Sequence, residues 1–280
     1  MTSNDLEIKN KLVELYLKQS WLIEHENPLE VLLKPLRNVR QRKQILNLLF
    51  KFRYVTYSDR SQSIYDLKEY LVDSTYLTSE NSVISGLSFD SEPDSSHAVL
   101  QTLKYFLAET RLMNIDMSVK IPDSIKKAKK KEYLILVDEF SGTGDTIISR
   151  FNSIKNELKN QKIEHLNIQV ILLAAMEKAL VKIRSNHINV ISWEILKPAI
   201  QSIQIKREKK YLYLLNSLLE NTLLPKINNT DLPNLGYGSS ESMFSTERQN
   251  PPNNNLSILW WPYNKDGSMR ESLLKRAQKY

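Results

Sequence analysis

Two adjacent carboxylates, Asp138 and Glu139, stand just before a segment of small and hydroxyl-bearing residues, Ser141–Thr146. Such a segment has a chemical use. Glycines let the backbone approach a ligand closely, and N–H groups at a helix N-terminus, helped by hydroxyls, can hold a phosphate. Thr143 and Thr146 supply the hydroxyls. The stretch therefore predicts a phosphate site beside a pair of carboxylates.

The residues on either side of this segment predict how it is positioned. Residues 133–137 (YLILV) are almost all apolar, which is typical of an interior strand in a parallel sheet covered on both faces. A helix is predicted over residues 145–160. Carboxylates at the carboxyl end of such a strand point into the crevice where open α/β sheets bind ligands.

Two common nucleotide-binding motifs do not fit the segment. A dinucleotide site needs G-x-G-x-x-G, but Ile147 occupies the third glycine position after Gly142 and Gly144. The run LILVDE resembles a Walker B strand. That interpretation requires a G-x-x-x-x-G-K-[ST] loop, which occurs nowhere in the 280 residues.

Residues 133–148 (YLILVDEFSGTGDTII) resemble the phosphoribosyl-pyrophosphate (PRPP) motif of type I phosphoribosyltransferases, an apolar strand, two acidic residues and a loop ending T-G-x-T. The resemblance implies that Asp138 and Glu139 are the catalytic pair and bind the ribose 2′ and 3′ hydroxyls. It implies Mg²⁺ between the pyrophosphate and these hydroxyls, indirectly held by the pair. The implied 5′-phosphate ligands are Ser141, Gly142, Thr143, Gly144, Asp145 and Thr146.

One departure from that family concerns the purine-salvage members, which place an Asp where this chain has Gly142. The chain therefore lacks the carboxylate that can act as a base toward the nucleobase in those members. Asp145 is an unusual neighbour for a phosphate, because its charge would repel the anion. We expect its side chain to point to solvent or to cap the following helix.

A second segment, residues 81–113, is compatible with the same family resemblance. Residues 81–89 predict a strand, residues 90–96 a loop, and residues 97–113 an amphipathic helix capped by Asp94, Ser95 and Ser96. The resemblance implies that this loop contacts pyrophosphate, although it carries acidic residues where the family has a basic one. We expect Arg248, in a loop closing over the site, to supply the missing positive charge.

The stretch 250–261 (NPPNNNLSILWW) resembles a signature of a phosphoribosyltransferase-like branch found in bacterial conflict systems, including retrons. This implies an effector of antiphage defence. Its implied partners are a retron reverse transcriptase and the DNA–RNA product of that enzyme. Trp260 and Trp261 are predicted to anchor the chain's return to the core.

The predicted fold class is α/β, a parallel-sheet, type I phosphoribosyltransferase-like core with a helical N-terminal region and a C-terminal hood or flap. The three regions are residues 1–75, residues 76–225, and residues 226–280 with a terminal helix. Residues 235–248 are the candidate flap, in which Tyr237 or Phe244 could stack on a base. The stretch 51–60 (KFRYVTYSDR) could line the site or simply pack at a helix end.

The composition of the chain argues against some classes of function. The chain has no cysteine and four scattered histidines, which argues against thiol catalysis and against zinc. Its net charge is +7, with lysine-rich runs at 126–131 and 206–210 that predict a solvated face or a polyanion contact. No leader or membrane segment is apparent, and we expect a cytoplasmic protein.

Three functions remain open on the sequence. The first is a PRPP-dependent glycosyl-transfer enzyme, toxin-like within a defence system. The second is a non-catalytic module that binds PRPP or another nucleotide and regulates a partner. The third is a scaffold that binds a reverse transcriptase and nucleic acid, with a vestigial pocket.

Overall fold

The computed structural model of the chain describes residues 3–89 and 95–277. Contacts divide the chain into two compact units. One is continuous, Tyr57–Leu196, and is called here the α/β unit. The other combines Met1–Thr56 with Lys197–Tyr280 and is called the discontinuous unit. The regions predicted from the sequence divide at 75/76 and 225/226, whereas the compact units divide at 56/57 and 196/197.

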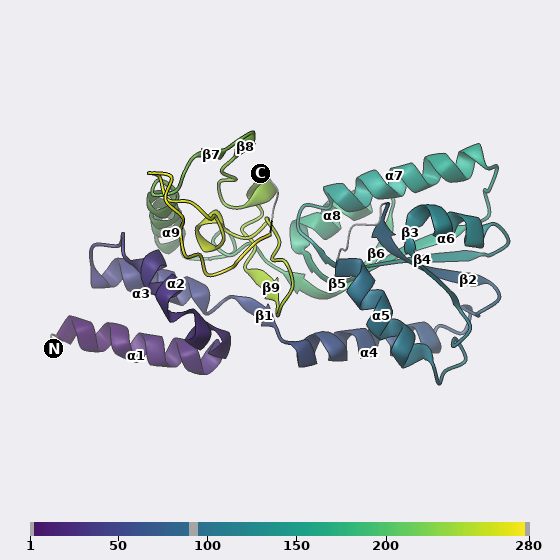
Figure 1. Cartoon of the computed structure of the whole chain (residues 1–280), viewed down its shortest axis with the longest axis horizontal. Helices are drawn as coiled ribbons and strands as arrows, with labels where there is room; N and C mark the ends of the chain where they lie inside the picture. Colours follow the sequence, from purple (N-terminus) through teal and green to yellow (C-terminus); the bar gives the residue numbers. More distant parts are fainter. Residues whose placement is uncertain (1–2, 90–94, 278–280) are drawn as a thin grey trace. The chain divides into compact units, whose positions relative to one another are not determined.

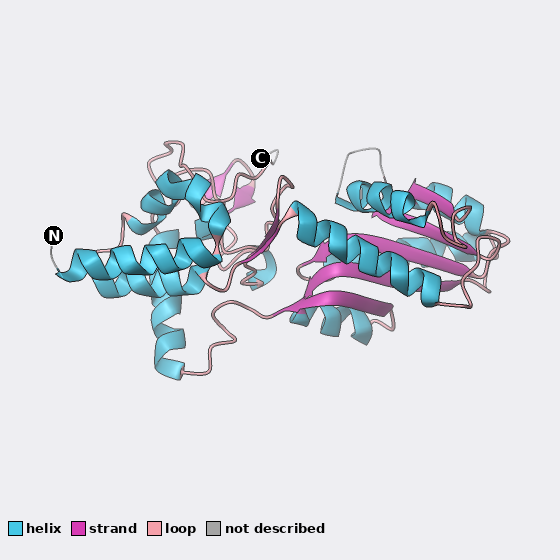
Figure 2. Cartoon of the chain, turned by 90° about the horizontal axis from the view of Figure 1, so that it is seen from below, coloured by secondary structure: helices cyan, strands magenta, loops and turns pink. Residues whose placement is uncertain are grey.

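The α/β unit is built on a five-stranded sheet in the order β3-β2-β4-β5-β6, in which every neighbouring pair is parallel (Figure 2). Its strands are β2 (Ser82–Ser88), β3 (Asp116–Lys120), β4 (Tyr133–Ser141), β5 (Asn167–Met176) and β6 (Asn189–Leu196). Its helices are α4 (Tyr57–Asp73), α5 (Ser95–Leu107), α6 (Ile121–Ala128), α7 (Asp145–Asn160) and α8 (Glu177–Ser185). The predicted α/β core on a parallel sheet is confirmed.

Helices cover both faces of this sheet (Figure 1). Side chains of β4 alternate between the faces: Leu134 and Leu136 pack with residues of α6, α7 and α8, and Ile135 and Val137 pack with α4 and α5. This double burial explains why the strand is a continuous apolar run rather than an alternating one.

The order of the strands creates a switch point between β2 and β4. From β2 the chain crosses through α5 to β3 on one side, and from β4 it proceeds through α7 and α8 to β5 and β6 on the other. Ligands of open α/β sheets bind outside the carboxyl ends of the strands at such a point. The carboxyl ends of β2 and β4 are therefore the place where this fold would hold a ligand.

The discontinuous unit surrounds a separate core of leucines, isoleucines and the tryptophan pair. Its helices are α1 (Ser3–Lys18), α2 (Glu26–Leu33), α3 (Val39–Leu49) and α9 (Lys206–Glu220), with 3-10 turns η1 (Ser20–His25), η2 (Tyr237–Ser239) and η3 (Ser257–Leu259). Its short strands are β1 (Arg53–Val55), β7 (Lys226–Ile227), β8 (Thr230–Asp231) and β9 (Phe244–Thr246). Trp260 and Trp261 are 2% and 0% exposed, so the prediction that they anchor the core is confirmed.

The C-terminal region differs from the sequence prediction in two respects. The terminal helix is wrong for the described residues, since no helix follows η3 up to residue 277. Leu273 and Leu274 are buried in the core of the discontinuous unit by a segment of irregular structure. The candidate flap is partly wrong, because Phe244 is 3% exposed in β9, which pairs with β1. A ring so buried offers no face to a base.

None of the described helices is long and apolar enough to cross a membrane.

Candidate functional site

The end of β4 places Asp138 at the switch point. Asp138 is half-buried, and its Oδ1 accepts a hydrogen bond from the Ser95 hydroxyl at 3.0 Å and from the Glu139 backbone N–H at 2.8 Å. Ser95 is the first residue of α5, which follows β2. The bond therefore joins the first residue of the helix that follows β2 to the carboxyl-terminal part of β4, and it orients one carboxylate oxygen.

Glu139 lies in a different environment. It continues the alternation of β4 toward the α4 face, where Arg60 of α4 donates from Nε to Glu139 Oε1 at 2.8 Å. Both side chains are at least nine-tenths buried. The guanidinium Nη2 is also buried, with no hydrogen-bond partner among the described residues. The two predicted catalytic carboxylates are thus unequal, because Asp138 is the more accessible and Glu139 is neutralised by a buried cation.

The loop after β4 is short and its glycine is required. Gly144 stands at the N-cap of α7 with φ of +82°, a left-handed conformation that favours glycine. A Cβ there would lie 3.0 Å from Ile183 Cγ1 and 3.1 Å from the Ala179 carbonyl oxygen, both in α8. Close packing and backbone conformation together explain why the segment predicted as a phosphate cradle contains glycine at this position.

The remaining residues of the loop are arranged around the start of α7. Ser141 is buried, Gly142 and Thr143 are half-buried, and Thr146 is exposed in the first helical turn. The Thr143 hydroxyl accepts the Asp145 N–H at 3.3 Å. The first turn of α7 carries the partial positive charge of a helix N-terminus, which favours an anion.

The Asp145 side chain is exposed to solvent, one of the two placements expected from the sequence. Its carboxylate pairs with Lys182 of α8. The Lys182 ammonium, and secondarily the Thr143 hydroxyl, lower the pKa of Asp145 below its usual range. Lys182 is therefore a second cation beside the loop, and half of its side chain is exposed.

The segment after β2 is described only in part. Asp94 lies outside the described residues, whereas Ser95 and Ser96 begin α5. Ser96 is 1% exposed, and its Oγ lies 2.6 Å from where a Cβ on Gly86 would stand. Gly86 thus permits the close approach of α5 to β2, and Ser95 is the serine that reaches Asp138.

Arg248 belongs to the discontinuous unit. Its side chain is 91% exposed, and its Nε lies 3.9 Å from Glu247 Oε1. Its predicted role beside pyrophosphate stays a prediction. Tyr237, the other aromatic residue of the candidate flap, is half exposed.

The described residues contain no group of three or more His, Cys, Asp or Glu side chains that could hold a metal ion by themselves. Asp138 is a suitable oxygen ligand for Mg²⁺, a metal that usually binds one or two carboxylates together with substrate phosphates. Glu139 is less suitable, because its charge is already compensated by Arg60. The residues present thus fit a magnesium ion that arrives with a phosphorylated ligand.

Two cations of the site were not among the predicted site residues. Arg60 ends the aromatic and basic stretch 51–60, which the sequence marks as a segment that could line the site. Lys182 has no such signal, because it is 37 residues from Asp145 and becomes its neighbour only when α8 packs on α7.

Comparisons with known proteins give a family. The family model described as PRTase-CE matches residues 35–276. One similar solved structure is a hypothetical protein from Neisseria gonorrhoeae with bound ppGpp, at 15% identity and a TM-score of 0.34, covering 57% of this chain and 96% of that one. Another is the Helicobacter pylori xanthine-guanine-hypoxanthine phosphoribosyltransferase, at 8% identity and a TM-score of 0.31, covering 52% and 85%. No curated protein matches the chain.

Proposed function

The chain belongs to the PRTase-CE family, and we propose that its α/β unit binds a phosphorylated ribose, PRPP or a nucleotide, at the carboxyl ends of β2 and β4. The observation that carries the proposal is the hydrogen bond between Ser95 and Asp138. It orients a half-exposed carboxylate at the switch point, directly before a Gly-Thr-Gly loop that opens a helix.

In this proposal each part of the site has one task. The loop 141–146 and the first turn of α7 hold the 5′-phosphate through backbone N–H groups and hydroxyls. Asp138 accepts hydrogen bonds from the ribose hydroxyls, held in place by Ser95. Lys182 neutralises Asp145, which removes a charge that would otherwise repel the phosphate. A magnesium ion, where bound, would supply positive charge to pyrophosphate as it leaves.

We further propose that the protein is the glycosyl-transfer effector, toxin-like, of an antiphage defence system such as a retron, with a reverse transcriptase as partner. The support for this finer statement is the resemblance of residues 250–261 to the signature of that branch.

Displacement of pyrophosphate at the anomeric carbon needs a site that excludes water and holds fixed dipoles more than it needs covalent chemistry, because charge develops on the sugar ring in the transition state.

A second candidate, a non-catalytic module that senses PRPP or a nucleotide, is favoured by one observation. Glu139, one of the two carboxylates that the resemblance makes catalytic, is bound to Arg60 and buried. A binding module needs only the phosphate loop and Asp138. Release of pyrophosphate from PRPP by the purified protein with its acceptor would reject this candidate.

The test of ligand binding is calorimetric titration of PRPP with magnesium into the wild type and two matched variants. Thr146→Glu places a negative charge at the start of α7, where it would repel a phosphate but suits the helix dipole, so folding is preserved. Ser149→Glu, one turn further along and also exposed, is the control. We expect at least about tenfold weaker binding for Thr146→Glu and none of this loss for Ser149→Glu. Equal affinities, or no binding by the wild type, would reject the proposal.

A further inference from the structure

The positive charge of the chain is concentrated in the discontinuous unit. That unit contains 22 Lys and Arg against 13 Asp and Glu, a net charge of +9, whereas the α/β unit has 17 against 19, a net charge of −2. The unit that carries the ribose-phosphate site is therefore not the unit that gives the protein its basic character. A net positive charge gathered on one part of a protein attracts polyanions and raises their rate of association.

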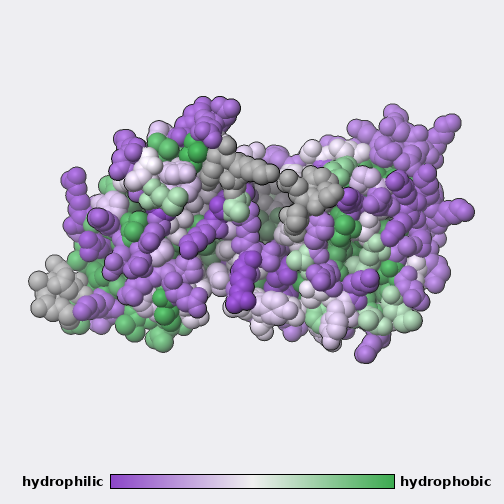
Figure 3. All heavy atoms as spheres, in the orientation of Figure 1, coloured by the Kyte–Doolittle hydropathy of each residue, from purple (hydrophilic) through white to green (hydrophobic). Residues whose placement is uncertain are grey.

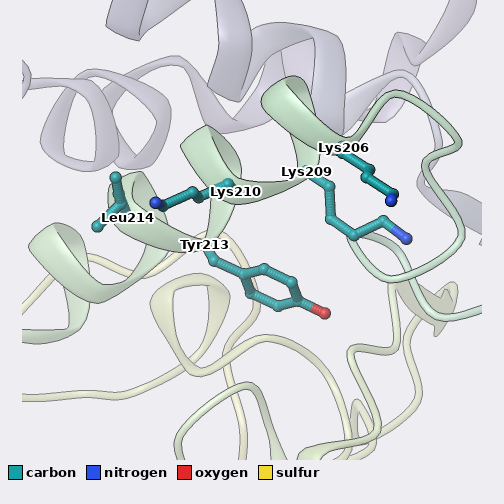
Figure 4. A pocket seen from close by; sticks show the side chains of 5 residues that line it. All are labelled: Lys206, Lys209, Lys210, Tyr213 and Leu214. Carbon is teal, nitrogen blue, oxygen red and sulfur yellow. The ribbon is translucent and has the colours of Figure 1, made fainter.

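Within the discontinuous unit, one face of α9 carries a row of lysines. Lys206, Lys209 and Lys210 line a hollow of about 360 Å³ together with Tyr213 and Leu214. Figure 4 shows the ammonium groups of Lys206 and Lys209 extending toward the same side of the helix, with the Tyr213 ring beside them. The spacing of i, i+3, i+4 and i+7 explains why these residues share a face. None of the described residues that line this hollow carries a carboxylate.

The ammonium groups of these three lysines make no contact with an acidic or hydrogen-bonding partner among the described residues. Within residues 3–89 and 95–277, neither an ion pair nor a hydrogen bond engages the ammonium group of Lys206, Lys209 or Lys210. An external anion would therefore meet these ammonium groups without first breaking an internal hydrogen bond or ion pair of the described residues.

The other lysine-rich run of the chain, residues 126–131, provides the contrast. Lys127 donates to the Met117 carbonyl oxygen at 2.7 Å, and Lys131 pairs with Asp116 at 3.0 Å. Lys126 lies 3.6 Å from Asp123. Part of this run is therefore engaged in holding α6 and β3 in place, although it contains more lysines than α9.

An aromatic ring with a fixed position completes the α9 face. The Tyr213 hydroxyl donates to Glu241 Oε1 at 2.6 Å, and Glu241 is 3% exposed. Burial and the Glu241 carboxylate raise the pKa of Tyr213, so the ring stays uncharged. A fixed ring beside unpaired ammonium groups suits a nucleotide chain, in which a base packs on the ring and the phosphates meet the lysines. Preorganisation also reduces the entropy lost on binding.

A second hollow of the same unit has a related composition. It has a volume of about 450 Å³ and also borders α9, through Glu208 and Leu212. Its lining includes Phe50, whose ring centroid lies 4.4 Å from Lys11 Nζ and 5.9 Å from Lys18 Nζ. The face of the molecule drawn in Figure 3 is mostly hydrophilic, with small hydrophobic areas between the hydrophilic side chains. Aromatic rings interleaved with cations are typical of surfaces that follow a single strand.

From these observations we propose that the α9 face, defined by Lys206, Lys209, Lys210 and Tyr213, is a nucleic-acid-binding surface that contacts the phosphodiester backbone of a single strand. The surface lies on the discontinuous unit and is independent of the ribose-phosphate site. It reads charge and stacking rather than base sequence, because ammonium groups and an aromatic ring contact every nucleotide in the same way.

The test measures binding of a fluorescein-labelled oligothymidylate of about 20 nucleotides, longer than a typical single-strand site of roughly 4–16 nucleotides. Fluorescence anisotropy gives the affinity of the full-length protein at several salt concentrations. The test variant is K206Q/K209Q/K210Q. The matched control is K126Q/K129Q/K130Q, which removes the same charge from the other run.

For single strands the slope of log K against log salt is about −0.7 for each phosphate neutralised, so loss of three contacts should reduce its magnitude by about 2. We expect this change, and at least about tenfold weaker binding, only in the α9 variant. Equal losses in both variants would overturn the proposal, because the effect would then follow net charge. Absence of binding by the wild type, or binding only to phosphatidylserine vesicles, would overturn it as well.

Titration of PRPP with magnesium into the same variants separates this proposal from the proposed function. We expect unchanged PRPP affinity in the α9 variant, which would also show that it is folded. Loss of oligothymidylate binding with PRPP binding intact supports a separate surface. Loss of both by a variant that keeps the wild-type circular dichroism spectrum would mean that the α9 lysines are needed for both ligands, and would overturn the proposal of a separate surface.

Discussion

At the scale of single residues, the buried pair of Arg60 and Glu139 gives a prediction for stability. Both side chains are at least nine-tenths buried, with 2.8 Å between Arg60 Nε and Glu139 Oε1. Replacement of one partner leaves the other as an uncompensated buried charge. We expect Arg60→Met to lower the free energy of unfolding by about 3–5 kcal/mol. Urea-induced unfolding followed by circular dichroism measures this change in the free energy of unfolding.

The double variant Arg60→Met with Glu139→Gln is the control for this prediction. It removes both charges and keeps side chains of similar volume, so we expect it to recover most of the lost stability. If the double variant is no more stable than Arg60→Met, the pair does not behave as a compensated buried ion pair. The folded double variant also shows whether Glu139 is needed for ligand binding, separately from its effect on stability.

Glu220, in the last turn of α9, gives a pH-dependent prediction. It is 8% exposed, and Oε1 accepts the Leu235 N–H at 2.8 Å. Burial raises the pKa of this carboxyl above its usual range, which the Leu235 N–H partly offsets. The raised pKa means that the stability from Glu220 is fully present below its unfolded-state pKa of about 4.3 and is lost as the pH rises through the higher folded-state pKa.

Glu220→Gln removes this titration while retaining an oxygen that can accept the Leu235 N–H. We therefore expect the stability of the variant relative to the wild type to increase as the pH rises from 4 to 8. Urea midpoints of the two proteins across that range measure the difference, in which all other titrating groups cancel. A difference independent of pH would contradict the prediction.

At the scale of elements, the hydrophobic pattern was sufficient to predict the long, uniformly buried helices and strands. The helix predicted over 145–160 coincides with α7, and the strand predicted from Tyr133 lengthens to Ser141 in β4. β3 was missed because its sequence, DMSVK, contains two charged residues and lies at the edge of the sheet, where no residue is fully buried. An edge strand takes its structure from the neighbour it pairs with, which its own sequence does not show.

The stretch 228–255 shows a different limit of sequence reasoning. Its Asn, Ser, Gly and Pro content predicts a long loop or flap, and in the structure side-chain hydrogen bonds take the place of regular backbone bonds. Asn255 accepts the Phe244 N–H and donates to the Phe244 carbonyl oxygen, both at 2.7 Å. Glu241 accepts the N–H groups of Ile200 and Gln201 at 2.8 and 2.7 Å. The composition shows that the segment is polar. Only the fold shows that these polar side chains make hydrogen bonds to backbone groups inside the protein.

The bond from Tyr213 to Glu241 tests how firmly this stretch is attached to α9. Tyr213→Phe removes the hydroxyl that donates at 2.6 Å and leaves the buried Glu241 carboxylate one donor short. We expect the free energy of unfolding to fall by about 1–3 kcal/mol, the cost of an unmet buried hydrogen-bonding group. Urea unfolding measures the loss. An unchanged stability would mean that water replaces the hydroxyl without cost.

At the scale of the whole molecule, the sequence could not predict which distant segments form one unit. The N-terminal helices share a core with α9 and with the tryptophan pair, and β1 pairs in parallel with β9 across 190 residues of chain. Local periodicity carries no information about such pairings, because any amphipathic helix can cover many apolar surfaces. The predicted site residues of β4 and α7 were easier to place, since they are consecutive in the chain.

The division into two units also separates the two proposed binding activities. Hydrogen exchange measured by mass spectrometry on the full-length protein can locate each one. PRPP with magnesium should slow exchange in residues 133–148 and at the start of α5, because bound phosphate holds the N–H groups of the loop and stabilises the folded state. Oligothymidylate should instead slow exchange in α9 and in α3, which packs against it.

The two protection patterns are independent consequences of different chemistry, one ligand held by backbone N–H groups and the other by lysine side chains. Protection at 133–148 by both ligands would mean that the nucleic acid enters the ribose-phosphate site as a nucleotide. Protection of α9 by PRPP would mean that its lysines bind any polyphosphate. Either pattern would place the specificity of the protein in a single anion site, whereas separate patterns would make ligand binding and nucleic-acid binding properties of different units.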